Sequence, residues 1–235
     1  MRYLMSILLA LPLTAASAPR TIAIPALSFG QGRWSVLKLV NHSNSPHPLT
    51  VEVYRENGAK LPLGGPLLLQ PNETREIRLE AETDKPRELC WAKVVDPAAN
   101  DSAVEATATL EVLQGNTIES FSRPPAEPSR QTHWLSLSAS VQGKDLYFLN
   151  ASDKTVSVGF CSSSNRLVSG CDRSVRRYPV KPHQTLLIGI GRLRGRYFMT
   201  EASASGQALV TLLVPGKGER KVFSSDSSIQ FQDVP

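Results

Sequence analysis

The chain has 235 residues, with 26 Lys and Arg against 21 Asp and Glu, and its net charge is +5. The excess of basic residues is mild and we expect no exposed aromatic residues interleaved with it, so it is typical of a solvated surface and argues against a nucleic-acid partner. After the first 18 residues no segment is apolar over the length that a membrane-spanning helix needs, so the sequence predicts no membrane insertion.

The first segment, residues 1–18, reads MRYLMSILLALPLTAASA. Arg2 supplies a positive charge, Ser6–Leu13 a short apolar core, and Thr14–Ala18 a run of small residues, which is the layout of a secretory signal peptide. Cleavage after Ala18 is expected, with the bond after Ala16 as an alternative. The sequence therefore predicts an exported protein.

The rest of the chain repeats itself at an offset of about 110 residues. LKLVNHS at 37–43 and LTVEVY at 49–54 correspond to LYFLNAS at 146–152 and TVSVGF at 155–160. Between the copies lies SRPPAEPSR, a Pro-rich stretch that cannot form a central strand. We therefore expect a signal peptide (1–18), an N-terminal domain (19–122), a link (123–130) and a C-terminal domain (131–235).

Within each copy the apolar residues alternate over short runs that are separated by turn residues. Asn57-Gly58 is a strong signal for a β-hairpin, and the turns at 70–73 and 181–184 match each other in the two copies. Short strands at this spacing, without an amphipathic helix longer than two turns, are typical of an antiparallel sandwich. The sequence predicts an all-β chain with two tandem immunoglobulin-like β-sandwich domains.

Asn41 and Asn150 begin Asn-x-Ser patterns that match the acceptor of N-glycosylation. Both lie at the same place in the repeat, where an apolar strand meets a turn. An Asn side chain suits that junction because it can bond to the backbone two residues further on. Turn formation is therefore the favoured interpretation, and glycosylation is the alternative.

The three cysteines divide into a pair and a single residue. Cys161 and Cys171 enclose a short loop and, in an oxidising compartment, are natural partners for a disulfide bond. Closing such a loop contributes about 2–3 kcal/mol to stability. Cys90 remains, and we expect a small buried strand residue there instead of a reactive thiol, because no His or Asp clusters around it.

No pattern predicts an enzyme. The four His residues lie far apart in sequence and lack metal-ligand spacing, and the serines at 162–164 lack the nucleophile elbow. Gly189–Gly195 has misplaced glycines for a phosphate loop and no strand–loop–helix unit around it. We expect no catalytic residue, no cofactor and no metal site.

Several motifs in order along the chain resemble the periplasmic chaperones of chaperone–usher pili. In the first copy these are SVLKLVNHSNSPHPLTVEVY, LLLQPNETREIRL, RELCWAKVVDP and FSRPP. In the second copy, FCSSSNRLVSGCDRSVRRYPVKPHQTLLI is similar to the alternate branch of the family, which serves colonisation-factor and cable-type pili and carries a Cys pair before a Tyr-Pro turn. The resemblance covers nearly the whole chain after residue 18.

The resemblance implies a function in the periplasm. A chaperone of this kind lends a β-strand to pilin or adhesin subunits and delivers them to an outer-membrane usher. A donor strand needs alternating apolar residues, and EATATLEVL at 105–113 offers Ala106, Ala108, Leu110 and Val112. The alternative is that these residues fill the protein's own core. The competing function is a secreted tandem immunoglobulin-like adhesion or structural protein without chaperone activity.

The resemblance also implies a pair of basic residues that hold the C-terminal carboxylate of the subunit. The two corresponding positions fall near Leu27 and Glu119, and neither is basic. Other arginines are then candidates for the carboxylate anchor, with the first preferred because it adjoins the interdomain link: Arg123, Arg130, Arg20 and Arg33.

Overall fold

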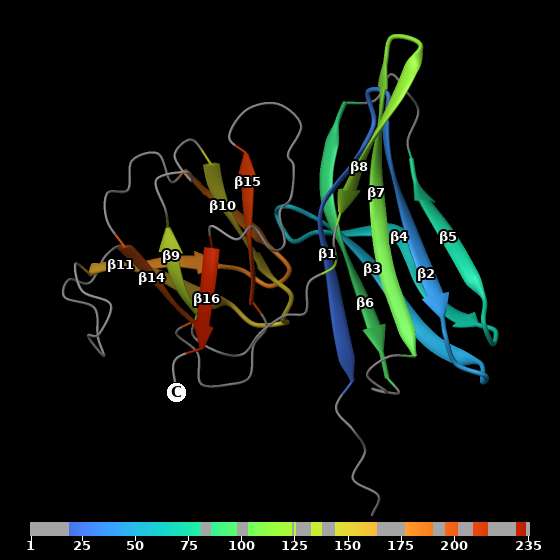
Figure 1. The fold of residues 1–235 in the computed structure, drawn as a ribbon, viewed down its shortest axis with the longest axis horizontal. Helices are drawn as coiled ribbons and strands as arrows, with labels where there is room; N and C mark the ends of the chain where they lie inside the picture. The colour runs from blue at the N-terminus through green and yellow to red at the C-terminus, as the bar shows by residue number, and fades with distance from the viewer. Residues whose placement is uncertain are drawn as a thin grey trace, which may run out of the picture.

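The computed structural model describes residues 19–80, 86–97, 103–123, 125, 133–137, 144–163, 177–189, 196–201, 209–215 and 229–233. All regular elements within these ranges are β-strands, which lie in antiparallel sheets (Figure 1). The predicted all-β fold is confirmed, and the first half of the chain is a β-sandwich.

The strands of the first half are β1 (Arg20–Phe29), β2 (Arg33–Asn41), β3 (His47–Arg55), β4 (Lys60–Leu69), β5 (Thr74–Leu79), β6 (Glu88–Asp96), β7 (Val104–Gln114) and β8 (Thr117–Arg123). One sheet has the order β1-β6-β3-β4 and the other the order β5-β2-β7-β8. Since β8 extends to Arg123, that residue belongs to the sheet and not to the expected link.

Alternation of side chains explains why these segments pair as they do. In β2 the buried residues include Leu37 and Leu39, whereas Lys38 between them is exposed. Leu37 lies opposite Ile77 of β5 and Ala108 of β7, so the inner faces of three strands meet at one level of the core. The facing sheet supplies Val51, Val53 and Val94 to the same core.

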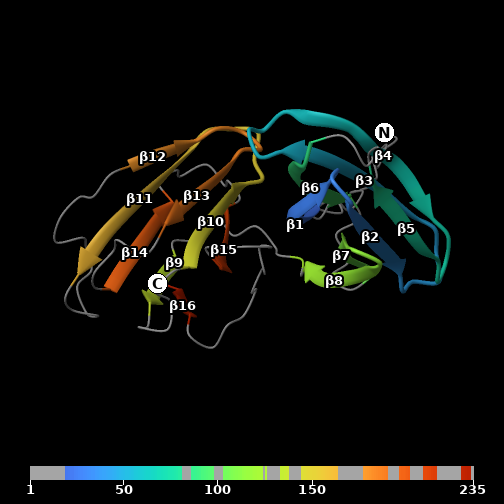
Figure 2. The ribbon, with the colours of Figure 1, turned by 90° about the horizontal axis from the view of Figure 1, so that it is seen from above.

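The strands of the second half are β9 (His133–Leu137), β10 (Lys144–Asn150), β11 (Val156–Ser163), β12 (Arg177–Val180), β13 (Thr185–Gly189), β14 (Arg196–Glu201), β15 (Leu209–Pro215) and β16 (Ile229–Asp233). They form sheets with the orders β13-β10-β15 and β12-β11-β14-β9-β16. The two groups of strands lie side by side (Figures 1 and 2). Every sheet draws its strands from one group, although the division into two domains stays a prediction.

The duplicated turn seen in the sequence recurs in three dimensions. Asn41 is fully buried, and its Nδ2 donates to the carbonyl oxygens of Ser45 and Gln70 at 2.9 and 3.0 Å. Its Oδ1 accepts from the backbone N–H of Ser43 at 2.9 Å. This amide therefore holds two turns together from inside the protein.

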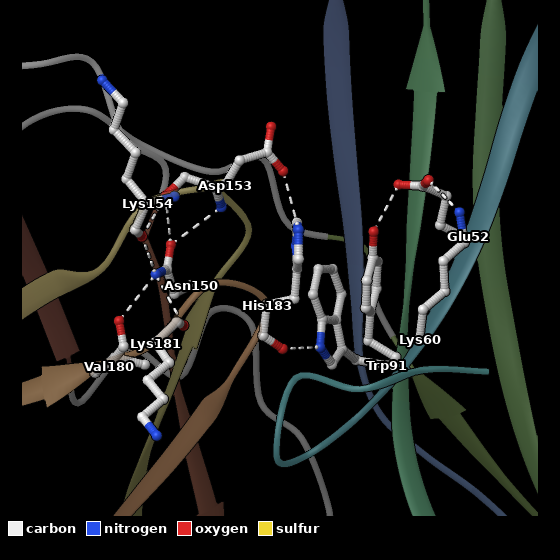
Figure 3. A network of polar contacts seen from close by, with 11 residues as sticks. Glu52, Lys60, Trp91, Asn150, Asp153, Lys154, Val180, Lys181 and His183 are labelled. Carbon is white, nitrogen blue, oxygen red and sulfur yellow. Dashed lines mark hydrogen bonds and ion pairs between the residues drawn. The ribbon is translucent and has the colours of Figure 1, made fainter.

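Asn150 makes the same contacts in the second copy. Its Nδ2 donates to the carbonyl oxygens of Lys154 and Lys181 at 2.7 and 3.0 Å, and its Oδ1 accepts from the N–H of Ser152 at 3.0 Å (Figure 3). Both side chains are buried and bonded through oxygen and nitrogen alike, so the turn interpretation is confirmed over glycosylation at these two positions.

The matching turns also have the same geometry. Asn72 has φ of 56° and His183 has φ of 58°, both in the left-handed region, where Asn and His are more frequent than most residues. In the first turn a Glu73 carboxylate oxygen accepts from the N–H of Gln70 at 2.6 Å. In the second, Gln184 Oε1 accepts from the N–H of Lys181 at 3.0 Å. The repeat therefore extends to individual side-chain contacts.

Candidate functional site

The predicted donor residues lie in the core of the protein itself. Ala106, Ala108, Leu110 and Val112 are each at most 4% exposed, and they alternate along β7 with residues that face outward. β7 is a central strand, because it pairs with β2 on one side and β8 on the other. Its side chains and backbone are thus already used, as the core-filling alternative held, and we correct the candidate donor strand from β7 to β8.

β8 forms the edge of its sheet. Among the described strands none pairs with its outer side, and Thr117–Ser120 are all exposed. The two-residue turn Gly115-Asn116 joins it to β7, and the hairpin extends beyond the neighbouring strands (Figure 1). Ile118 is 56% exposed and lies opposite Leu113, which is 46% exposed, so the end of the hairpin presents an apolar pair to solvent.

The other described edges of the first sandwich carry features that block pairing. β4 contains Pro62 and Pro66 and an irregular register beside Gly64, while the short strand β5 presents alternating charged residues, including Glu76 and Arg78. Proline, bulges and charged side chains are the usual means by which proteins prevent edge-to-edge association.

β1 is blocked in two ways. Pro25 interrupts it within a register shift between Ile24 and Leu27. Its Ala23 and Ala26 also pack in an apolar cluster with Tyr147 of the second half. By contrast, β8 has no proline and no register shift, and Glu119 is its only charge before Arg123. β8 is therefore the unprotected edge among the four described here.

The hairpin geometry fixes which backbone groups of β8 face the free edge. Gln114 and Thr117 flank the two-residue turn and are paired, and such a flanking pair exchanges its hydrogen bonds within the hairpin. Along an antiparallel ladder, bonded and non-bonded pairs alternate. The N–H and C=O groups of Ile118, Ser120 and Ser122 therefore point outward. The Ser122 C=O accepts from Arg123, and an additional strand can bond to the other groups.

The preferred anchor residue, Arg123, is 1% exposed. Its Nε donates to the carbonyl oxygen of Ala26 at 2.8 Å, and its Nη1 donates to the carbonyl oxygen of Ser122 at 3.2 Å. Ala26 has φ of 54° and lies in the irregular part of β1. In this arrangement Arg123 fixes the β1 bulge against β8, and its guanidinium does not face solvent.

The remaining anchor candidates do not come together. Arg20 donates from Nη1 to the carbonyl oxygen of Val104 at 3.2 Å, at the beginning of β7, whereas Arg33 lies opposite Val112 near the other end of that strand. At the two positions where the family has basic residues, the chain has the buried, apolar Leu27 and the exposed, acidic Glu119, so neither position supplies a positive charge. Arg130 lies outside the described residues. Arg20, Arg33 and Arg123 therefore lie at different levels along β7, and the carboxylate anchor stays a prediction.

Cys90 is fully buried in β6, as predicted. Burial raises the pKa of its thiol, and the carboxylates of Glu88 and Glu56 act in the same direction. A thiol of this kind is unreactive while the fold is intact. Cys161 lies in β11 opposite Phe198, but Cys171 is outside the described residues, and the disulfide bond stays a prediction.

Several polar contacts that the sequence does not predict join the two halves. Trp91 Nε1 donates to the carbonyl oxygen of His183 at 2.9 Å (Figure 3). The Thr185 N–H donates to the carbonyl oxygen of Glu56 at 2.8 Å. Asn57 forms an isolated β-bridge with Gln184. No local pattern indicates these pairs, because the partners are about 90–130 residues apart. We call the hairpin turn 55–59 and the turn 181–184 together the junction.

Comparison with known proteins gives no functional guide. No protein-family model and no curated protein matches the chain. Among solved structures, the crystal structure of vicilin from Corylus avellana (hazelnut) is similar at 8% identity and a TM-score of 0.25, over 87% of this chain and 74% of that one. A structural similarity this weak supports no conclusion about the fold or function of this chain. Over the described residues there is no helix long and apolar enough to cross a membrane.

Proposed function

We propose that the protein is a periplasmic, non-enzymatic assembly chaperone, which binds pilin or adhesin subunits through a β-strand and delivers them to an outer-membrane usher. The observation that carries the proposal is the free, unprotected edge of β8 in a sandwich whose other edges are blocked. The order of sequence motifs that resembles the chaperone family supplies the class of partner.

The binding mode is β-augmentation. A subunit that lacks one strand of its own sandwich exposes a sheet edge and an apolar groove. Ile118, Ser120 and Ser122 offer backbone groups for a continuous ladder with that edge, and each such hydrogen bond contributes about 0.5–1.5 kcal/mol net. Ile118 and the half-buried Phe121 are the apolar side chains of β8. Backbone bonds thus supply most of the attraction.

The proposal does not rely on a buried arginine clamp. Arg123 is bonded to Ala26 and Ser122 within the sandwich, and withdrawing a buried cation from its partners costs several kcal/mol. Its role is to hold β8 next to the bulge of β1. We therefore expect the subunit to be held mainly along β8 and at the apolar end of the hairpin.

A single backbone N–H provides the test. Ser120→Pro removes an outward N–H of β8 without removing a bond to β7, whereas Ser120→Ala keeps the N–H and serves as the matched control. Each variant is co-expressed with the pilin subunits encoded beside its gene, and soluble 1:1 complex is measured by size-exclusion chromatography. Loss of one edge bond, about 1.4 kcal/mol, weakens binding about tenfold.

The outcome separates the two candidate functions. A complex that forms with the native chain and with Ser120→Ala but is depleted with Ser120→Pro supports strand pairing at β8. A complex that survives Ser120→Pro unchanged excludes this edge. If no subunit forms a complex with the native chain, the proposal fails and the tandem adhesion or structural protein becomes the better explanation.

A further inference from the structure

The junction contains a histidine at a position that the first copy of the repeat gives to an asparagine. Asn72 and His183 have nearly equal left-handed φ angles in equivalent turns. Asn72 is exposed, whereas the His183 side chain lies between the two halves of the protein (Figure 3). The equivalent turn accepts an asparagine, so the turn does not require the contacts that the imidazole makes with the first sandwich.

The His183 ring packs on the aromatic side chains of the first sandwich. It is stacked on Tyr54, with 4.1 Å between ring centroids and 16° between planes, and Tyr54 is in turn stacked on Trp91 at 5.0 Å. The carbonyl oxygen of the same histidine accepts the Trp91 indole N–H. His183 therefore contacts Tyr54 through its ring and Trp91 through its backbone carbonyl and also its ring, whose centroid lies 6.2 Å from that of the indole.

The two ring nitrogens have different surroundings. Nε2 lies 2.9 Å from Asp153 Oδ1, and because a carboxylate only accepts, Nε2 carries the proton of the neutral ring. Nδ1 is buried and has no hydrogen-bond partner among the described residues. Protonation of the ring would place a second N–H at Nδ1, in a site that offers it no acceptor.

The charges around the ring come from three elements. Asp153 belongs to the turn after β10, Lys93 to β6 and Glu52 to β3, where Glu52 is bonded to Lys60 and Tyr54. Burial lowers the pKa of His183, with Lys93 acting in the same direction and Asp153 and Glu52 opposing. The ring is therefore neutral in the closed junction near pH 7.

We propose that His183 is an acid-released clasp between the two halves: the neutral ring closes the junction by stacking on Tyr54, and protonation opens it. The lowered pKa means that the open form binds the proton more readily than the closed form. Stability of the junction is therefore complete above the ordinary histidine pKa of about 6.5 and is lost as the pH falls below that value. Because the apolar cluster that includes Ala23, Ala26 and Tyr147 also joins the two halves, protonation loosens the junction, and the halves move apart as that cluster is exposed.

The test follows the native chain between pH 7.5 and 5 by two measurements. The NMR signal of the Trp91 indole N–H reports the bond to His183, and small-angle X-ray scattering reports the separation of the halves. We expect the signal to shift and the radius of gyration to increase together, in step with titration of the His183 ring. An unchanged signal and radius while the ring becomes protonated, or a ring that does not titrate above pH 4, would overturn the proposal.

Substitutions distinguish an electrostatic clasp from a merely structural contact. Lys93 lies in the first half and disfavours the charged ring only while the junction is closed, so Lys93→Gln should raise the pKa of the closed form towards that of the open form and move opening to lower pH. Asp153 lies in the same half as His183 and favours the charged ring in both forms, so Asp153→Asn should also move opening to lower pH. His183→Asn, the residue of the equivalent turn, should leave the junction open at both pH values. His183→Phe keeps the stacking without a titrating group and should stay closed at pH 5. An opening of Lys93→Gln that begins at higher pH than that of the native chain would contradict the mechanism.

Discussion

Gly58 is the position at which the junction is most sensitive to a small change. Its φ is +89°, and a Cβ atom added there would lie 2.5 Å from the carbonyl oxygen of Pro182 and 3.3 Å from the backbone nitrogen of Gln184. Both neighbours are backbone atoms, so neither can move aside as a flexible side chain would. Gly58→Ala must therefore push the two turns of the junction apart.

The expected cost has two parts. The left-handed conformation costs an alanine about 1–2 kcal/mol, and overpacking against fixed atoms adds about 1–3 kcal/mol. Gly115 provides the matched control, because its φ is +60° and an added Cβ meets nothing within 4 Å. Gly115→Ala should therefore carry only the conformational cost, and the difference of about 1–3 kcal/mol measures the close contact.

Urea unfolding followed by circular dichroism gives both free energies, and scattering at pH 7.5 reports whether the halves have separated. We expect Gly58→Ala to lose more stability than Gly115→Ala or to adopt a larger radius of gyration with the strands of both halves still folded. Equal unfolding free energies together with an unchanged radius would refute the close approach of the two turns, and with it the geometry on which the clasp depends.

Three further outcomes follow from burial and hydrogen bonding. Leu110→Ala should lower the free energy of unfolding by about 2–5 kcal/mol because the side chain fills the core. Ile118→Ala on the exposed edge should change it by no more than about 0.5 kcal/mol. Comparable losses in the two variants would mean that β7 and β8 are misassigned. Asn150→Ala should lower the free energy of unfolding by at least about 2 kcal/mol, because the buried carbonyl groups of Val180 and Lys181 lose their donor. A decrease in melting temperature no larger than that of Ile118→Ala would show that Asn150 does not hold the turns together. Cys90 should resist alkylation at pH 8 until urea unfolds the chain, because burial raises its pKa; labelling of the folded protein, mapped by mass spectrometry, would show that β6 is accessible.

Much of the fold follows from patterns that are local in sequence. Alternation along LKLVN and EATATLEV predicts strands and their inner faces, Asn57-Gly58 predicts the hairpin between β3 and β4, and the repeated Asn-x-Ser predicts the two turns. These signals depend on near neighbours along the chain. The structure reproduces them down to the bonds of Asn41 and Asn150.

The candidate site depends on information that alternation does not contain. Alternation identifies the buried face of a strand, but the order of strands in the sheet decides which strand is an edge, and this is why β7 looked like a donor although β8 has the free edge. Its place beside the expected link makes Arg123 the preferred anchor in the sequence, yet the side chain is buried and bonds to Ala26, 97 residues away. The contact of His183 with Tyr54 likewise arises only when the two halves meet.

The central claim is that a subunit pairs with the outer edge of β8. Hydrogen–deuterium exchange, measured on the native chain alone and in complex with a co-expressed pilin subunit, tests it most directly. We predict that the amides of Ser120 and Ser122 exchange rapidly in the free chain and become protected in the complex, while amides of the β4 and β5 edges do not change. Protection that appears at β4 or β5 and leaves Ser120 and Ser122 unchanged would contradict the account.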